Sequence, residues 1–439
     1  MRNQSIINRS LQSVWHPCTQ MKQHETYPLI PIKSGDGVWL IDAEGKRYLD
    51  AVSSWWVNLF GHNNPRIKDA IKHQLDTLEH VMLAGFTHEP VVALSEKLAQ
   101  LTGLGHAFYA SDGASATEIA LKMSFHYWRN LYSGVLGKPQ KTKFINLQNS
   151  YHGETLGALG VTDVAIFKDT YAPLLMQSAQ MLSPDFRLAE VGESPEAFAL
   201  RCADALENYV STHSHELAAL IIEPLVQCAA GMGMYHPIYL ARAREICTRY
   251  EVHLIVDEIA VGFGRTGTMF ACEQAHIKPD FICLSKGITG GYLPLSVVMT
   301  TDNVYQTFYD DSTVRAFLHS HSYTGNPLAC SAALATLAIF ETDSVIESNQ
   351  SKSAFIANKI QLLGEIAHTH LRHQGMIFAF DVTTNNTKFS RDCYSAALQQ
   401  GLLLRPIGNT VYWMPPYTIN ETEADFLLQA TLKAVLASI

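Results

Sequence analysis

The chain has 439 residues, of which 47% are hydrophobic and 17% are charged, the composition of a globular protein that can bury a large core. Its 32 basic and 41 acidic residues give a formal net charge of −9. This balance argues against a nucleic acid or an anionic membrane as the partner. No apolar run approaches the ~20 residues that are needed to span a bilayer.

The N-terminal stretch and the cysteines indicate the compartment. The stretch lacks the apolar segment of a secretory signal peptide, so we expect the protein to stay in the cytoplasm. Its eight cysteines would remain reduced there. They are scattered, without a Cys-x-x-Cys pair or a Cys/His cluster at metal-ligand spacing, and we therefore predict no structural zinc.

In chain order, an irregular N-terminal arm comes first, followed by two short strands within residues 37–50, joined by a turn at Glu44-Gly45. Helical patterns follow at 65–81 and 91–103. Strand-like and helical runs then alternate, which predicts a parallel sheet with helices on both faces. The strand-like runs are 106–111, 143–150, 217–224, 252–258, 280–286 and 295–301, and the helical runs are 117–132, 198–211 and 239–250.

After roughly residue 335 the pattern changes to two helical stretches, a strand-like run at 376–382 and a final strand, turn and helix. This predicts a separate C-terminal α/β unit, against which we expect the N-terminal arm to pack. The expected division is an N-terminal segment 1–60, a large domain 61–335 and a small C-terminal domain 336–439.

The most informative residues follow two apolar runs that are typical of buried parallel strands. One run ends at Asp257, and the other ends at Ser285-Lys286-Gly287. Open α/β sheets bind ligands at the carboxyl ends of such strands. A lysine that forms a Schiff base and an acid that keeps a pyridine nitrogen protonated fit pyridoxal phosphate (PLP). The alternatives are a surface lysine in a loop for Lys286 and a helix N-cap or a turn acid for Asp257.

Two further segments follow strand-like runs. The small-residue turn at 111–114 opens a helix, whose backbone N–H groups could hold a phosphate, although Ser-Asp-Gly also caps ordinary helices. Tyr151 could stack on a flat cofactor ring or be a packed tyrosine beside a turn.

Three other features leave alternatives open. The loop 262–267 with Arg265 fits neither a P-loop nor a G-x-G-x-x-G fingerprint, so it is either a flexible loop or a segment that orders the site. Arg405 could bind a substrate carboxylate in bidentate fashion or form a surface ion pair. Trp55-Trp56 are either core side chains or an apolar wall for a substrate.

Together these segments resemble class III aminotransferases of the fold-type I PLP enzymes. The matching motifs are DEIAVGFGRTG, the SKG lysine, SDGASATEIALK, YHGET and SYTGNPLA, and they extend over most of the chain. The resemblance implies an α/β fold with a large PLP-binding domain. A mostly parallel sheet flanked by helices would form that domain, and the N- and C-terminal segments would form a smaller α/β domain.

The resemblance also implies roles around the cofactor. Lys286 would form the Schiff base and move the proton, and Asp257 would hold the pyridinium. Tyr151 would stack on the ring, with Glu223 as an acid near it. The phosphate would be bound by Gly113, Ala114 and Ser322, the last from the partner subunit of a homodimer.

Further segments, at 15–22, 53–56, 226–237 and 403–417, are similar to family members that use S-adenosylmethionine and 8-amino-7-oxononanoate as substrates. In this chain Trp55 and Arg405 would bind the oxononanoate chain and its carboxylate, with Tyr412 close by. Cys18 stands in the substrate wall where some members have tyrosine, which puts contacts to the amino donor in doubt. Ser322 replaces a threonine, and Glu154 replaces an aspartate.

Three alternatives to this assignment remain. Another class III transaminase would act on an ω-amino acid, ornithine or a diamine. Lysine could replace S-adenosylmethionine as donor, and no residue excludes it. A non-catalytic binding or scaffold protein could retain the fold, but the intact Lys286 and Asp257 argue against that alternative.

Overall fold

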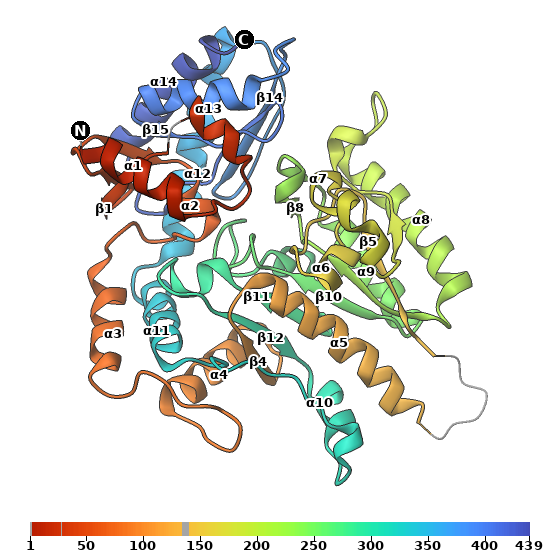
Figure 1. The fold of residues 1–439 in the computed structure, drawn as a ribbon. Coiled ribbons are helices and arrows are strands. Elements are labelled where there is room, and N and C mark those ends of the chain that lie inside the picture. Colours follow the sequence, from red (N-terminus) through yellow and green to blue (C-terminus); the bar gives the residue numbers. More distant parts are fainter. Residues whose placement is uncertain (1, 28, 134–139) are drawn as a thin grey trace. The chain divides into compact units, whose positions relative to one another are not determined.

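The computed structural model describes residues 2–27, 29–133 and 140–439, which form two compact units (Figure 1). Unit 1 comprises Met1–Pro65, Ser351–Leu371 and Ile377–Ile439, and unit 2 comprises Arg66–Gln350 and Arg372–Met376. These bounds differ from the expected segments, because the N-terminal segment extends to Pro65 and the C-terminal part of unit 1 starts at Ser351. The short piece Arg372–Met376 belongs to unit 2, which no sequence pattern indicated.

Unit 2 is built on a seven-stranded sheet. The strands lie in the order β4 (His106–Ala110), β12 (Ser296–Thr300), β11 (Phe281–Leu284), β10 (His253–Asp257), β7 (Leu217–Ile222), β5 (Lys143–Leu147) and β6 (Ala179–Met181). Neighbouring strands are parallel from β11 to β6, and β12 runs antiparallel to both β11 and β4. The predicted mostly parallel sheet is confirmed. Every residue of β7, β10, β11 and β12 is buried, as continuous apolar runs predict.

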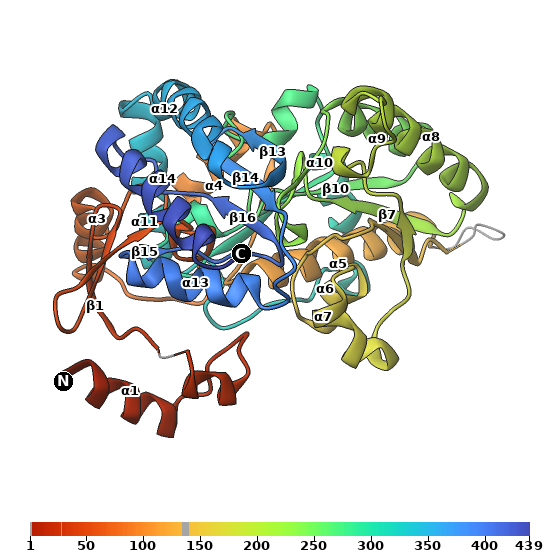
Figure 2. The same cartoon turned by 90° about the horizontal axis from the view of Figure 1, so that it is seen from above.

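Helices cover both faces of this sheet (Figure 2). The helices α8 (Pro195–His213) and α9 (Ile238–Arg249) lie on one face, and α5 (Gly113–Leu131) lies on the other. Ile119, Tyr127 and Trp128 of α5 pack with Ile255 and Phe281 of the strands in one buried cluster. The other elements of the unit are α4 (Glu89–Thr102), α6 (Leu156–Gly160), α7 (Ala165–Lys168), β8 (Val226–Gln227), β9 (Gly233–Met234), α10 (Asp302–Phe308) and α11 (Pro327–Thr342).

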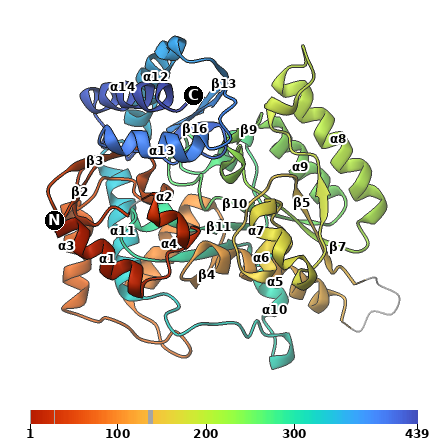
Figure 3. The same cartoon turned by 45° about the horizontal axis from the view of Figure 1, so that its top comes forward.

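Unit 1 contains two small sheets. One has the order β1 (Ile32–Asp36), β2 (Trp39–Asp42), β3 (Arg47–Asp50) and β15 (Leu402–Leu403), and the other has the order β13 (His368–Gln374), β14 (Ile377–Val382) and β16 (Thr410–Trp413). Figure 3 shows α13 (Phe389–Gln399) and α14 (Glu421–Leu436) packed together beside them. The unit also holds α1 (Arg2–Ser13) and α2 (Ser53–Trp56). The boundaries between units fall within α3 (Pro65–Leu75), α12 (Val345–Ile360) and β13, whose residues from Arg372 onward belong to unit 2.

Most expected elements are confirmed, with differences at the two ends of the chain and in short elements. The helix expected at 65–81 ends at Leu75, and the N-terminal arm, which was predicted to be irregular, contains the helix α1 and the strand β1. The short elements β6, α6, α7 and α10 were not predicted, nor were β13 and α13 of the C-terminal part. The burial pattern of β13 mixes exposed and buried residues without alternation, which explains why periodicity did not reveal it.

Among the described residues no single helix is long and apolar enough to cross a membrane. The helices α11 and α12 are bent by 73° to each other. Only when they are taken together do they have the length and apolar composition of a membrane span.

Candidate active site

Asp257 and Lys286 lie at the carboxyl ends of two neighbouring strands. β10 and β11 are parallel, and Asp257 is opposite Cys283 in their register. Lys286 follows two residues after the end of β11 and starts a 3₁₀ turn, Lys286–Thr289, with a left-handed φ of 43°. Burial lowers the pKa of the Lys286 amine, and the negative charge of Asp257 acts in the opposite direction. The two predicted groups therefore share one electrostatic environment, in which a neutral amine is accessible at lower pH than in water.

The Asp257 carboxylate is 4% exposed and is held on both oxygens. Oδ2 lies 2.7 Å from Nδ1 of His152, and Oδ1 accepts the backbone N–H of Ile259 at 3.0 Å. His152 is itself fixed, because its backbone N–H donates to Thr162 Oγ1 and its carbonyl accepts from Thr117 Oγ1. A buried carboxylate of this kind requires such partners. The sequence analysis assigned no role to His152, although it lies in the YHGET motif next to Tyr151.

Glu223 connects this pair to the neighbouring strand β7, which ends one residue earlier. Its Oε2 accepts the backbone N–H of Tyr151 at 2.9 Å, and its Oε1 accepts that of Cys228 at 3.2 Å. Burial raises the pKa of Glu223 to about 7, while His152 lowers it and the charge of Asp257 raises it. Glu223 thus lies within electrostatic range of the Asp257 group and fixes the backbone at Tyr151.

Tyr151 and the first turn of α5 border the same group. The Tyr151 hydroxyl donates to Glu154 Oε1 at 2.8 Å, and its ring is 5.5 Å from that of Phe167. The helix begins at Gly113 with Asp112 as N-cap, which accepts the Ser115 N–H at 2.9 Å.

Glycine allows close backbone approach at this turn. A Cβ at Gly113 would lie 3.0 Å from the Ile259 side chain, and a Cβ at Gly153 would lie 2.5 Å from that of Ala114. The amides of Gly113 and Ala114 are therefore at a helix N-terminus next to the segments that carry Asp257 and Tyr151, where an anion is favoured.

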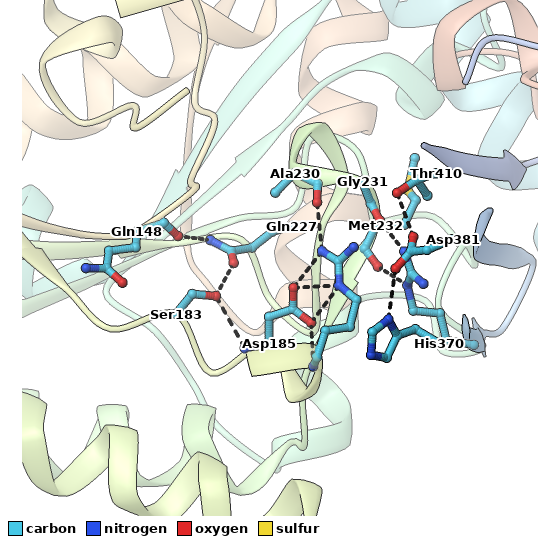
Figure 4. A network of polar contacts seen from close by, with 12 residues as sticks. Gln148, Ser183, Asp185, Gln227, Ala230, Gly231, Met232, His370, Asp381 and Thr410 are labelled. Atoms are coloured by element: carbon cyan, nitrogen blue, oxygen red, sulfur yellow. Dashed lines mark hydrogen bonds and ion pairs between the residues drawn. The ribbon is translucent and has the colours of Figure 1, made fainter. Parts of the chain in front are cut away.

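Two arginines that sequence reasoning missed hold the segment after β8. Arg187 pairs with Asp185 and donates from Nη2 to the carbonyl of Ala230 at 2.8 Å (Figure 4). Arg372 donates to the carbonyls of Gly231 at 2.6 Å and Met232 at 3.0 Å. In the same network Gln227 donates to the carbonyl of Gln148 and accepts from Ser183. Because Cys228 of this segment donates to Glu223, the contacts also fix the Glu223 carboxylate.

Arg265 and Glu258 are buried structural groups near these elements. Arg265 is 1% exposed, and its carbonyl accepts the N–H of Met376, so the loop 262–267 is an ordered part of unit 2. Glu258 points away from the Asp257 group and accepts the N–H groups of Ala271 and Cys272 at 2.9 and 2.8 Å.

The substrate residues expected in unit 1 form a second group. The Arg405 guanidinium carbon lies 4.4 Å from the centre of the Trp55 ring, and Trp55 remains 41% exposed. Trp56 is buried, and its Nε1 donates to the Tyr412 hydroxyl at 3.2 Å. Trp56 is therefore a core side chain, and the role of substrate wall stays a prediction for the exposed Trp55.

The backbone that carries these tryptophans is unusual. All four residues of α2 have positive φ, 50° at Ser53, 48° at Ser54, 73° at Trp55 and 72° at Trp56. None is glycine, and each non-glycine residue in this left-handed conformation costs roughly 1–2 kcal/mol. Cys18, also at positive φ, and Ser322 are both exposed, the former in unit 1 and the latter in unit 2.

The comparisons with known proteins agree with this geometry. The family model of class III aminotransferases matches residues 20–435. The chain belongs to the class III aminotransferase family, and its large unit has the fold-type I architecture of PLP-dependent transaminases.

Among curated proteins the chain is similar to the adenosylmethionine-8-amino-7-oxononanoate aminotransferase of Helicobacter pylori. The two are 49% identical over 429 residues, 96% of this chain and 95% of the relative. Among solved structures it is similar to the protein of the same name from Methanocaldococcus jannaschii, at a TM-score of 0.92 and 35% identity over 99% of both chains. It is also similar to an amine transaminase from an uncultivated Pseudomonas species in its PLP-bound form. That likeness has a TM-score of 0.90 and 30% identity over 97% of this chain and 99% of the other.

Proposed function

We propose that this protein is a PLP-dependent transaminase that moves the amino group of S-adenosylmethionine to 8-amino-7-oxononanoate, giving 7,8-diaminononanoate in biotin biosynthesis. The observation that carries the proposal is the partly buried Lys286, whose amine pKa is lowered by burial and which interacts electrostatically with Asp257 at the carboxyl ends of β10 and β11. Relatives that carry this activity in their names match nearly the whole chain, which supports these two substrates.

The residues of unit 2 fit PLP. Gly113 and Ala114 offer backbone N–H groups at a helix N-terminus for its phosphate, and Asp257 offers a buried carboxylate for its pyridine nitrogen. His152 Nε2 is buried and has no hydrogen-bond partner among the described residues, so a further polar atom lies beside the Asp257 carboxylate. When bound, the cofactor would accept the amino group from one substrate, delocalise the electrons of the broken Cα–H bond and pass the nitrogen to the other substrate.

Each protein group then has a defined task. Lys286 would hold the cofactor through its amine and, once released as a neutral amine, take the proton from the substrate Cα. Its lowered pKa supports this role, because a base must be unprotonated to act. Asp257 would keep the ring nitrogen protonated. The hydrogen bond with His152 would fix the orientation of the Asp257 carboxylate. Tyr151 would lie on the ring, and Glu223 would fix the Tyr151 backbone.

In unit 1, Arg405 and Trp55 would bind the acceptor. The guanidinium would pair with the carboxylate in bidentate fashion, and the exposed Trp55 ring would contact the aliphatic chain. Tyr412 would support this surface through Trp56, and Cys18 would belong to the substrate wall.

We further propose a homodimer in the cytoplasm. In unit 2 the segment of Ser322 and segments near it carry several exposed apolar side chains. Monomeric proteins rarely expose many apolar side chains together, so these residues support a second subunit that covers them. They are Met82, Phe86, Val314, Leu318 and Tyr323. Ser322 would complete the phosphate site of that partner. None of the eight cysteines, which all lie within the described residues, forms a disulfide, which is consistent with a reducing compartment.

Half-reaction spectra test the function. We expect S-adenosylmethionine to convert the purified PLP form to the amino form, and 8-amino-7-oxononanoate to convert it back. Lysine, an ω-amino acid and a diamine are the comparison donors, because the likeness to an amine transaminase makes such a donor the second candidate. Conversion by one of these alone, with no response to S-adenosylmethionine, would contradict the proposed donor.

A further inference from the structure

The left-handed turn Ser53–Trp56 is the most strained segment of unit 1, and its position is informative. It follows β3, and Arg405 follows β15; these two strands are parallel neighbours, with Leu403 opposite Asp50. The segments that carry Trp55 and Arg405 therefore both begin at the carboxyl ends of neighbouring strands, at the same edge of one small sheet. Four successive non-glycine residues with positive φ persist only where surrounding contacts hold them, and such strain concentrates at functional sites.

Two of the contacts that stabilise the turn Ser53–Trp56 are made by one buried carboxylate, that of Asp50. Asp50 is fully buried; its Oδ2 accepts the Ser54 hydroxyl at 2.7 Å, and its Oδ1 accepts the N–H of Val52 at 3.3 Å. His62 Nε2 lies 3.0 Å from the same Oδ2. Asn58 donates to His62 Nδ1, so the ring proton is on Nε2 and points at Asp50. A single carboxylate thus ties the start of the turn to the segment that follows it.

Further contacts stabilise the turn from strand β16 and from Met414, the residue that follows this strand. The Ser53 hydroxyl donates to the carbonyl of Met414 at 2.7 Å, and the Met414 N–H donates to the carbonyl of Ala51 at 2.8 Å. Trp56 donates to the Tyr412 hydroxyl. Ser54 and Trp55 are the exposed residues of the turn, and the Trp55 ring lies against Arg405.

We propose that Asp50 and Ser54 are positioning residues: they lock the left-handed turn so that Trp55 lies on one face of Arg405 and leaves the guanidinium edge for a substrate carboxylate. The inference rests on the proposed function, in which Arg405 binds the acceptor. A flat guanidinium with one face covered by an aromatic ring keeps its donor edge open. The class of ligand selected is an aliphatic chain that ends in a carboxylate.

A double-mutant cycle tests this positioning role. We expect Ser54→Ala in the holoenzyme to raise KM for 8-amino-7-oxononanoate about tenfold, as for the loss of one hydrogen bond to a charged group, with kcat changed less than about twofold. Because Ser54 would act through Arg405, Ser54→Ala should have no further effect in an Arg405→Ala background. Ser438→Ala, which removes a hydrogen-bonded serine hydroxyl elsewhere in unit 1, is the control and should leave KM unchanged.

The outcomes separate this inference from the function. An equal effect of Ser54→Ala in both backgrounds, or no effect while the wild type converts the acceptor, overturns the positioning role. If the wild type does not convert the acceptor, the proposed function fails. In that case the crystal structure of Ser54→Ala tests whether Ser54 fixes the position of Trp55, independently of the reaction. A retained 4.4 Å contact between Trp55 and Arg405 overturns the inference, and a displaced Trp55 ring supports it.

Discussion

In unit 2, Asp257 is the last residue of β10 and Lys286 follows the parallel strand β11, and all residues of both strands are buried. In unit 1, Trp55 and Arg405 also follow two parallel strands, but β15 has only two residues and the Trp55 segment is a left-handed turn. The first pair depends on regular structure. The second pair depends on side-chain contacts from residues more than 350 positions away, such as Tyr412 and Met414.

Because of this difference, substitutions should affect the two parts of the site in different ways. Substitutions in the sheet of unit 2 should reduce folding before they move Asp257, because the strands are locked by neighbours on both sides. In unit 1, loss of one polar contact at the turn should move Trp55 without unfolding the protein. Chemistry and substrate selection are therefore separable by mutation.

The largest effect should come from Lys286→Ala. It removes the group that would hold the cofactor and move the proton, and loss of a general base alone costs about 10²–10⁴-fold in kcat. The measurement is the turnover number with both substrates, with Lys278→Ala, an exposed lysine of the same unit, as control. Wild-type turnover in Lys286→Ala would assign the chemistry to another residue.

Arg405→Ala should act on substrate binding. Removal of a charge-assisted hydrogen bond costs about 1.5–3 kcal/mol, which corresponds to a roughly 10- to 150-fold higher KM for 8-amino-7-oxononanoate. Steady-state kinetics with varied acceptor measure it. An unchanged KM would place the carboxylate elsewhere and would remove the contrast between the two regions.

Sequence patterns predicted unit 2 well and unit 1 only in part, for a physical reason. Alternating runs and strand-end residues such as Asp257 are local signals, since each strand is buried along its whole length. The turn Ser53–Trp56 has no local signal, because left-handed residues are normally glycine or asparagine. Its contacts combine the nearby Asp50 with Tyr412 and Met414, which are distant in the sequence. His152, Arg187 and Arg372 were missed because the site groups that they contact are distant in the sequence: the Asp257 carboxylate and the carbonyls of Ala230 and Gly231 lie 43 to 141 positions away.

Arg372→Met should lower stability by a moderate amount. It leaves the carbonyls of Gly231 and Met232 without their charged donor, at about 1.5–3 kcal/mol in the free energy of unfolding. Urea denaturation measures it. Arg66→Met, which breaks an exposed pair with Asp343, should cost less than about 1 kcal/mol. Equal losses in the two variants would show that Arg372 contributes no more than a surface ion pair.

Glu258→Gln should change the pH dependence of stability. Burial raises the pKa of Glu258 to about 7 from the ordinary 4.5, so the folded state keeps a proton that the unfolded state releases above about pH 4.5. Its contribution to the free energy of unfolding is therefore complete below that pH and declines as the pH rises to about 7. Urea titrations at pH 5 and pH 8 should show a smaller decline in the variant. An identical decline would mean that Glu258 ionises normally.

Reduction of the purified PLP form with borohydride, followed by peptide mapping, tests the central claim most directly, because the reagent fixes the cofactor on the lysine that holds it. We predict that the pyridoxyl group is found on Lys286. Its attachment to a different lysine, or a cofactor that stays unattached, would contradict the account of Asp257 and Lys286 as the two ends of the cofactor site.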